Sequence, residues 1–288
     1  MYHIIVNSVS RKKRAQKNLK VFLAAAEERG RECAVYYTRC AGGGKELAEK
    51  ITAENPAAEI VVVGGDGTLH EVLNGLADPA VCRIGLIPSG TGNDFAAVAG
   101  IPLDAAEASR LVLDGEAKET DYLDVGGVRC MNVGGMGMDV EVLVRCRRGL
   151  IKGKIKYLLS LLQCLFAFKG YALTVESEGR KEPHSALIAV ACNGRRIGGG
   201  IPICPASVID DGKMDVVTVE CLSKWQIVKA FGKLMKGKVL EYPAAKHFLC
   251  ERVKITPAIP CTVQLDGELY NGLDFDVTIG RGLKIYRP

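Results

Sequence analysis

Short apolar runs alternate with amphipathic stretches over the first part of the chain, up to about residue 115. We expect the apolar runs to be strands, and they lie at residues 1–7, 33–38, 59–63 and 83–87. Between and after them, apolar side chains recur at helical spacing around residues 19–26, 45–53 and 105–113. Strands that alternate with helices predict a parallel sheet covered by helices, which is a three-layer α/β domain.

The pattern changes after residue 115, where short β-runs separated by glycines replace the alternation of strands and helices. Here Val125-Gly126-Gly127-Val128 predicts a hairpin turn, and residues 132–137 predict a glycine-rich bend. We therefore expect an α/β domain at residues 1–120 and a mainly antiparallel β domain at residues 121–279. A return of residues 280–288 to the first domain is left open.

One segment of the second half is almost wholly apolar, from Tyr157 to Phe168. Such a segment is too short to cross a bilayer, because a helix rises only about 1.5 Å per residue and the hydrocarbon core is about 30 Å thick. Two interpretations stay open. The segment is either a buried core helix or an apolar wall for a lipid tail.

Composition places the chain among globular proteins, since 48% of its 288 residues are hydrophobic and 25% are charged. The N-terminus does not resemble a signal peptide, so we expect a cytoplasmic protein. Eleven cysteines occur without a short paired spacing, which argues against disulfides and structural zinc. We expect most of these cysteines to be small buried residues.

The net charge of +5 is unevenly distributed. Residues 142–175 hold seven basic side chains and no acid, and residues 221–240 hold five lysines and no acid. Such stretches are either solvated helix faces or surfaces that attract polyanions. Nucleic acid is the weaker partner, because the few aromatic residues are not interleaved with the charges as stacking platforms would be. The anionic inner face of a membrane is the stronger one.

A glycine cluster follows the apolar run at 59–63 and directly precedes a helical pattern. Gly64, Gly65 and Gly67 let backbone N–H groups approach a ligand, and the helix N-terminus favours an anion such as phosphate. The Asp66 carboxylate would repel bare phosphate, so the site should also hold a metal ion, a ribose hydroxyl or a reacting hydroxyl. A plain strand-to-helix turn is the alternative interpretation.

A second turn of the same kind, residues 88–96, follows the run at 83–87 and contains Gly90, Thr91, Gly92 and Asn93. Ligands bind at the carboxyl edge of open parallel sheets, where successive turns converge. We therefore expect the two turns to form one phosphate-binding pocket.

Several ordered blocks of the chain resemble the diacylglycerol kinase catalytic-domain family, the lipid kinases that include bacterial members and the sphingosine and ceramide kinases. These blocks follow the family's order over nearly the full chain. They are Gly64–Leu76, Pro88–Ala96, Asn132 with Gly134–Gly137, Asn193 with Gly198–Gly200 and Pro205–Ala206, Asp211–Val216, and Asp266–Glu268. The resemblance implies the fold shared by NAD kinases and diacylglycerol kinases, with a nucleotide-binding α/β domain and a β-sandwich second domain.

The resemblance also implies transfer of the γ-phosphoryl group of ATP to a lipid hydroxyl, with Asp66 holding the catalytic Mg²⁺ directly or through water. Positioning and charge neutralisation supply most of such catalysis. The residues expected to bind the nucleotide are Asn7, Thr38, Gly64, Gly65, Asp66, Gly67, Thr68, Thr91 and Asn93.

Asp266 and Glu268 resemble the family's catalytic carboxylates. A lipid hydroxyl needs a nearby base to accept its proton. If residues 266–268 are extended, both carboxylates lie on one face of a strand. The sequence leaves open which of the two is the base.

A separate structural Mg²⁺ site is also implied by the resemblance. It would use the Asp211 carboxylate with the backbone carbonyls of Val208 and Lys213. Hard oxygen ligands of this kind suit Mg²⁺.

Two rival functions remain: an NAD kinase-like enzyme that phosphorylates a soluble nucleotide, and a catalytically silent lipid- or nucleotide-binding regulator. The intact carboxylates at Asp66, Asp266 and Glu268 disfavour the silent regulator. The expected partners are ATP and a lipid acceptor presented by the membrane, with peripheral membrane contact and no nucleic acid. A homodimer is left open.

Overall fold

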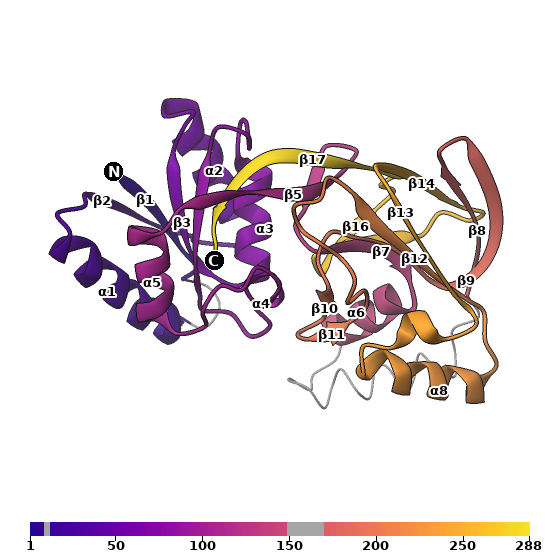
Figure 1. The fold of residues 1–288 in the computed structure, drawn as a ribbon. Coiled ribbons are helices and arrows are strands. Elements are labelled where there is room, and N and C mark those ends of the chain that lie inside the picture. Colours follow the sequence, from indigo (N-terminus) through magenta and orange to yellow (C-terminus); the bar gives the residue numbers. More distant parts are fainter. Residues whose placement is uncertain (9–11, 149–169) are drawn as a thin grey trace.

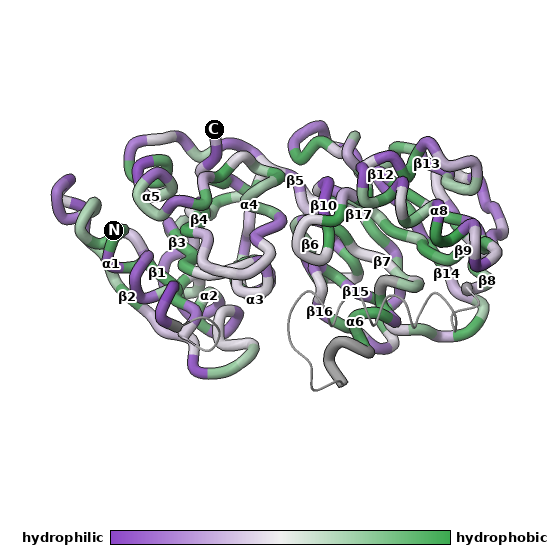
Figure 2. Tube along the Cα trace, turned by 90° about the horizontal axis from the view of Figure 1, so that it is seen from below, coloured by the Kyte–Doolittle hydropathy of each residue, from purple (hydrophilic) through white to green (hydrophobic). Residues whose placement is uncertain are grey.

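The computed structural model describes residues 1–8, 12–148 and 170–288. Two lobes lie side by side, and the chain forms the first lobe before the second (Figure 1). Figure 2 shows hydrophobic segments running through the interior of both lobes.

The first lobe is built on a parallel sheet, with the strand order β2-β1-β3-β4. Its strands are β1 (Tyr2–Val6), β2 (Cys33–Tyr37), β3 (Glu59–Gly64) and β4 (Arg83–Pro88). The sheet is buried on both faces, which explains why β1 and β3 are almost continuously apolar rather than alternating.

Helices cover both faces of this sheet, as the alternation of strands and helices predicts. Alternate residues of β1 and β3, such as Ile4 and Val61, pack with the helices α1 (Lys12–Glu28) and α5 (Ala105–Asp114). The intervening residues, such as Ile5 and Val62, pack with the other face's helices. Those helices are α2 (Gly43–Glu54), α3 (Asp66–Gly75) and α4 (Asp94–Val98).

The second lobe is mainly antiparallel, and it encloses its own apolar core. Its longer strands are β7 (Val133–Gly137), β8 (Tyr171–Ser177), β9 (Arg180–Cys192), β12 (Met214–Glu220), β13 (Ala245–Cys250), β14 (Arg252–Pro257), β15 (Thr262–Leu265) and β16 (Glu268–Asn271). Short elements complete it: β6 (Val128–Cys130), α6 (Met138–Arg148), β10 (Arg196–Ile197), β11 (Ile201–Pro202), α8 (Lys224–Met235) and a 3₁₀ turn at Val239–Glu241. The observed architecture agrees with the predicted fold class.

Two long strands, β5 (Ala117–Val125) and β17 (Phe275–Tyr286), run from one lobe to the other as an antiparallel pair (Figure 1). At its C-terminal end β17 also pairs in parallel with β4, through Lys284 opposite Arg83. Its N-terminal end pairs with β14 in the second lobe. One hydrogen-bonded sheet therefore continues through both lobes.

Comparison with the sequence-based expectations gives one confirmation and one correction. Val125 and Val128 pair across the predicted hairpin turn. Residues 133–137, expected as a bend, instead form strand β7 between β9 and β15. Strand β7 lies so close to β9 that a Cβ on Gly135 would lie 2.5 Å from the carbonyl oxygen of Ala189, which explains the glycine at this position.

The apolar segment from Tyr157 to Phe168 lies outside the described residues. No helix in the described part of the chain is long and apolar enough to cross a membrane.

Candidate active site

The two glycine turns meet in the structure, as the sequence predicts. A Cβ on Gly65, after β3, would lie 2.8 Å from the Cα of Gly90, after β4. Asn93 closes the second turn: its side-chain oxygen accepts a hydrogen bond from the Gly90 N–H at 3.0 Å. Asn93 has a left-handed backbone (φ 53°) and is buried, so in this structure it shapes the turn.

A cavity of about 410 Å³ opens in front of these turns. It is lined by Asn7, Thr38, Cys40, Ala41, Gly65, Asp66, Gly67, Thr68, Glu71, Gly90, Thr91 and Glu268. Most residues expected to bind nucleotide therefore lie together, and Gly64 and Asn93 are not among the lining residues. A Cβ on Gly64 would lie 2.6 Å from the Thr68 side chain, so glycine is required there.

Hydrogen bonds fix the polar wall of this cavity. The Asn7 side-chain amide donates to the Thr68 hydroxyl at 2.7 Å, which joins the end of β1 to the first turn of α3. Glu71 accepts hydrogen bonds from the N–H groups of Gly42 and Gly44, both at 2.8 Å. Glu71 thus holds the loop after β2 beside the cavity. Its place on α3, five residues after Asp66, is the signal in the sequence that could have indicated this role.

A second cavity, of about 300 Å³, adjoins the first and shares Asp66 and Thr91 with it. Residues of both lobes line it: Asp66, Thr91, Gly92 and Asp94 from the first lobe, and Asn132, Val133, Leu143, Arg196, Ile197, Gly198, Gly199, Asp266 and Gly267 from the second. The Gly199 N–H donates to Asp94 at 2.7 Å across this boundary.

Asp66 lies where the two cavities meet. It is the first residue of α3, and its carboxylate accepts a hydrogen bond from the Phe95 N–H at 3.1 Å. Burial raises the pKa of the Asp66 carboxyl above its ordinary value, and the negative charges of Asp94 and Asp266 raise it further. Burial likewise raises the pKa of Asp94. A region that disfavours carboxylate ionisation in this way would be stabilised by a cation.

The Asp266-Gly267-Glu268 segment is not extended, so the expectation that both carboxylates share one strand face is wrong. Asp266 (φ 52°) and Gly267 (φ 86°) form the two-residue turn of the β15–β16 hairpin, in which Leu265 pairs with Glu268. Two successive residues with positive φ are typical of a tight hairpin turn. The turn separates the carboxylates: Asp266 and Gly267 line the second cavity, and Glu268 lines the first.

Asp266 is a fully buried carboxylate with four donors. It accepts hydrogen bonds from the N–H groups of Met131 (2.7 Å) and Asn132 (2.8 Å), from His70 Nδ1 (3.1 Å) and from the Cys130 thiol (3.2 Å). Burial opposes ionisation, but the hydrogen bonds and the His70 ring outweigh it and hold the pKa of Asp266 below its ordinary value. A carboxylate so stabilised as an anion is a weak base.

The Glu268 carboxylate faces the glycine turn. Its Oε1 would lie 3.7 Å from a Cβ added to Gly67. Among the described residues, an acidic side chain of the second lobe therefore lies opposite the glycine turn that follows β3 in the first lobe.

His70 connects these elements, a role that was not predicted from the sequence. On α3 its ring contacts Asp266 through Nδ1 and the Tyr270 hydroxyl through Nε2 (2.7 Å). Burial raises the pKa of Tyr270 to about 12, with Glu268 the next cause, so Tyr270 is a neutral hydroxyl. The spacing of Asp66 and His70, one helical turn apart, was the available signal.

The expected metal-site residues Val208, Asp211 and Lys213 lie on one loop before β12, and none of them lines either cavity. The Asp211 carboxylate accepts from the Lys213 N–H at 3.0 Å, and the Gly212 N–H (φ 72°) donates to Asp121 at 2.7 Å. Burial raises the pKa of Asp121, and the negative charge of Asp211 contributes. Two carboxylates, Asp121 and Asp211, thus contact this loop, and the magnesium site stays a prediction.

Comparison with known proteins agrees with this architecture. Residues 1–125 match the diacylglycerol kinase catalytic domain, and residues 130–281 match the YegS C-terminal NAD kinase beta sandwich-like domain. A crystal structure titled as a diacylglycerol kinase from Bacillus anthracis has a TM-score of 0.78 at 25% identity, covering 100% of this chain and 96% of that one.

Curated relatives cover most of the chain as well. Diacylglycerol kinase of Bacillus subtilis is 28% identical over 94% of this chain and 90% of its own length. A protein of Pseudomonas aeruginosa named "Probable lipid kinase YegS-like" is 32% identical over 96% of this chain and 92% of its own. A Xanthomonas campestris protein of the same name is 34% identical over 84% and 83%. The chain therefore belongs to the family of diacylglycerol kinase and YegS-like lipid kinases.

Proposed function

We propose that the protein is a kinase that uses ATP and Mg²⁺ to phosphorylate the hydroxyl of a diacylglycerol-like lipid. The observation that carries this proposal is the pair of adjoining cavities that share Asp66 and Thr91. One cavity has the glycine turns suited to a triphosphate, and the other is partly apolar and open to a second substrate.

Asp66 is the residue that would hold the Mg²⁺ ion. The raised pKa values of Asp66 and Asp94 indicate a site that favours a cation. Asn132 lines the same cavity, and its buried side-chain oxygen lies beside Gly194. Carboxylate oxygens suit this ion. When bound, Mg²⁺ would neutralise charge on the phosphates.

Glu268 is the base in this proposal, and Asp266 positions it. The lipid oxygen forms a bond to the γ-phosphorus while the bond from that phosphorus to the bridging oxygen of ADP breaks. The hydroxyl proton passes to Glu268, which borders the nucleotide cavity. The Asp266 carboxylate accepts four hydrogen bonds, which hold the hairpin turn that directly precedes Glu268.

Helix α8 supplies a surface suited to an anionic membrane. Trp225, the single tryptophan of the chain, is 81% exposed, and Val228 and Met235 are about half exposed on the same helix. The basic residues of this surface are Lys224, Lys229, Lys233 and Lys236. Exposed apolar side chains among lysines are typical of a helix that lies in a membrane interface.

The position of α8 supports that role. The helix packs against β11, and the β10–β11 hairpin carries Arg196 to Gly199 into the second cavity. In Figure 1, α8 lies at the lower edge of the second lobe. A membrane under α8 would therefore be near the cavity proposed for the lipid.

The function is tested by incubating the purified protein with labelled ATP, Mg²⁺ and separate pools of diacylglycerol, sphingoid base, ceramide, phosphatidylglycerol and NAD. We expect transfer to a lipid, with diacylglycerol the leading acceptor. Transfer to NAD and to no lipid would identify the NAD kinase-like alternative. Nucleotide binding without transfer to any pool would identify the silent regulator.

The proposed base is tested with Glu268→Gln. General-base catalysis contributes about 10²–10⁴-fold, so we expect kcat to fall by that range while ATP affinity changes little. Glu27→Gln, an exposed glutamate on α1, is the matched control and should keep full turnover. Undiminished turnover of Glu268→Gln would reject this role.

A further inference from the structure

Three strands and one loop bring metal-binding side chains together in the second lobe, outside both cavities. Asp215 on β12 pairs directly with Cys192 on β9, so their side chains share one face of the sheet. His247 on β13 pairs with Val217, the next β12 residue on that face. The loop after β11 places Cys204 above the same face, where Cys192, Cys204 and Val217 share an apolar cluster.

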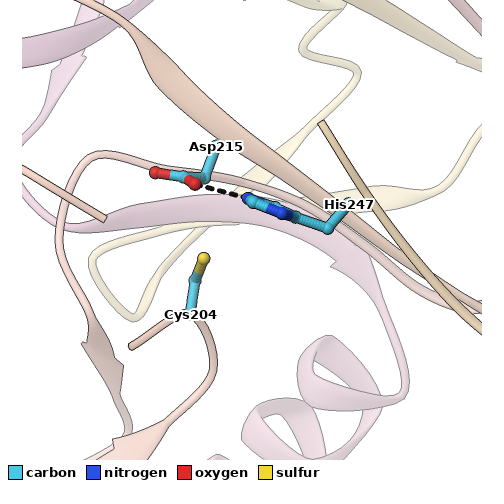
Figure 3. Close-up of side chains that lie close together, drawn as sticks. All are labelled: Cys204, Asp215 and His247. Atoms are coloured by element: carbon cyan, nitrogen blue, oxygen red, sulfur yellow. Dashed lines mark hydrogen bonds and ion pairs between the residues drawn. The ribbon is translucent and has the colours of Figure 1, made fainter. Parts of the chain in front are cut away.

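The donor atoms of Cys204, Asp215 and His247 point toward one another (Figure 3). The Cys204 sulfur, an Asp215 oxygen and a His247 ring nitrogen all lie within 4.8 Å of one another. His247 Nε2 lies 2.5 Å from Asp215 Oδ1. Ligands of one zinc ion lie about 2.0–2.3 Å from it, so small side-chain movements would bring the three atoms to bonding distance.

Burial and charge favour a cation here. Cys204 is fully buried and the Asp215 side chain is 3% exposed, whereas the His247 ring is 27% exposed. A buried carboxylate is costly unless a positive charge or a metal compensates it. The partly exposed ring of His247 gives a small ion a route from solvent.

The neighbouring Cys192 favours the thiolate of Cys204. A hydrogen bond with Cys192 is the largest cause that lowers the pKa of Cys204 to about 7. Burial raises the pKa of Cys192 well above its usual value, so Cys192 stays a thiol and can donate that bond. The thiolate is the form of cysteine that binds metals.

We propose that Cys204, Asp215 and His247 form a zinc site, with the fourth ligand position open to water on the side of His247. A thiolate, an imidazole and a carboxylate form a mixed set that suits Zn²⁺ and disfavours Mg²⁺, which takes oxygen ligands. The ligands come from positions far apart in the chain. Sequence spacing alone therefore argued against zinc.

A nucleophilic role for the same residues fits the structure less well. A Cys–His pair used in catalysis must present its sulfur to a substrate, and the buried Cys204 sulfur does not reach the surface. A metal ion is small, so it can bind the Cys204 sulfur without the opening that a large substrate would need.

The site would also secure the loop that borders the second cavity. Cys204 lies five residues after Gly199, which hydrogen-bonds to Asp94 across the two lobes. Zinc bound to Cys204 would tie this loop to β12 and β13. The inference does not depend on the proposed kinase activity.

The test is the metal content of the full-length protein, purified under reducing conditions without chelator and then titrated with Zn²⁺ against a chromophoric chelator. We expect one tightly bound Zn²⁺ per chain. Replacing it with Co²⁺ should give the near-ultraviolet sulfur-to-cobalt charge-transfer band and the visible bands of a tetrahedral site. No ATP or lipid is present, so the outcome is separate from that of the kinase assay.

Two variants identify the ligands. Cys204→Ser should remove the charge-transfer band. His247→Ala, at a partly exposed position, should keep the circular dichroism spectrum of the folded protein. Mutating a residue that only hydrogen-bonds to a metal ligand lowers metal affinity by roughly 10–100-fold, and we expect this variant to lower zinc affinity by more. Cys221→Ser, an exposed cysteine elsewhere, is the control and should bind zinc normally.

Three outcomes would overturn the proposal. They are a folded wild-type protein that binds no zinc, a cobalt spectrum unchanged by Cys204→Ser, and a Cys192–Cys204 disulfide in place of bound metal in protein purified without reductant. The last would make the two cysteines a redox pair.

Discussion

At the scale of single residues, two carboxylates only two positions apart, Asp266 and Glu268, differ sharply in environment. The Asp266 side chain is 2% exposed and surrounded by donors, whereas Glu268 begins β16 and borders the first cavity. Their separation follows from the hairpin turn, which directs the two side chains to different cavities. These environments support the proposal that Glu268 is the base and that Asp266 positions it, a choice that the sequence left open.

Replacing Asp266 with Asn should lower stability. The side-chain NH₂ group of Asn would face at least one of the donors that now hydrogen-bond to the carboxylate. Hydrogen bonds to a buried charge are worth about 1.5–3 kcal/mol each, so we expect a loss of about 3 kcal/mol in the free energy of unfolding at pH 7. Urea unfolding would measure it.

The pH dependence of that loss gives a further check. Because the folded-state pKa of Asp266 lies below the unfolded value of about 3.9, its stabilisation is present above that value and is lost as pH falls through the folded pKa. The gap between wild type and Asp266→Asn should therefore narrow below about pH 4. A gap that stays constant down to pH 3 would contradict this account.

Replacing Asp66 with Asn should have the opposite effect on stability. Its pKa is raised in the folded state, so ionisation opposes folding as pH rises above the unfolded value. In protein freed of metal by EDTA at pH 7, we expect Asp66→Asn to raise Tm by about 2–4 °C, the shift that ~1 kcal/mol produces in a large domain.

The same variant should lose activity and the stabilisation by added Mg²⁺ and ATP. Thermal scans with and without both ligands would measure this. A variant that is less stable than wild type in EDTA at pH 7 would show that the carboxylate does not oppose folding.

At the scale of elements, sequence patterns predicted most of the first lobe and less of the second. Helices and strands alternate visibly in the first lobe because each strand is buried between helix layers. In the second lobe the pairing partner decides the conformation: residues 133–137 are a strand because β9 and β15 lie on both sides. Asp266-Gly267 forms a turn because β15 and β16 pair around it.

The candidate site was predicted in part for the same reason. Glycines and acids near strand ends mark the first cavity, so Asp66 and Thr91 could be identified from local sequence, whereas Thr68 followed from the family resemblance. His70 and Glu71 act through partners remote in the chain, Asp266 and the loop at residues 42–44. Such contacts depend on the folded arrangement, and no local pattern encodes them.

The contact between the two glycine turns gives a prediction at this scale. A Cβ on Gly90 would lie 2.6 Å from the Cα of Gly65, so Gly90→Ala must push the turns apart. We expect ATP affinity to fall at least tenfold, measured by calorimetry, since both turns bind the phosphates in our proposal.

Gly232→Ala is the matched control, because nothing lies within 4 Å of its added Cβ and it sits inside helix α8. It should leave ATP affinity unchanged and raise stability by up to about 1 kcal/mol. Equal ATP affinity in Gly90→Ala and wild type would mean that the turns do not bind phosphate together.

At the scale of the whole molecule, the two lobes share one sheet and one candidate site. Asp66, Thr91 and Asp94 of the first lobe line the second cavity together with Asn132 and Asp266 of the second. Neither lobe alone contains the set of residues that the proposed reaction requires. In our proposal, the surface of α8 contacts a membrane while this shared site binds the lipid.

The single tryptophan makes the membrane contact measurable. Vesicles containing anionic lipid should shift the emission of Trp225 to shorter wavelength, because its exposed ring would enter the apolar interface. Zwitterionic vesicles should give a smaller shift, and high salt should weaken binding. Trp225→Ala should reduce vesicle sedimentation while keeping turnover on diacylglycerol in detergent micelles. An emission spectrum unaffected by anionic vesicles would argue against α8 as the contact.

Strand β17 has a consequence for how the chain is made. It pairs with β4, which lies about 200 positions earlier, and with β5 and β14. On the ribosome, the first lobe can form its β2-β1-β3-β4 sheet early, but the edge of β4 stays without this partner until residues 275–286 have emerged. The nascent first lobe therefore carries an open sheet edge through most of synthesis, the kind of surface that chaperones protect from aggregation.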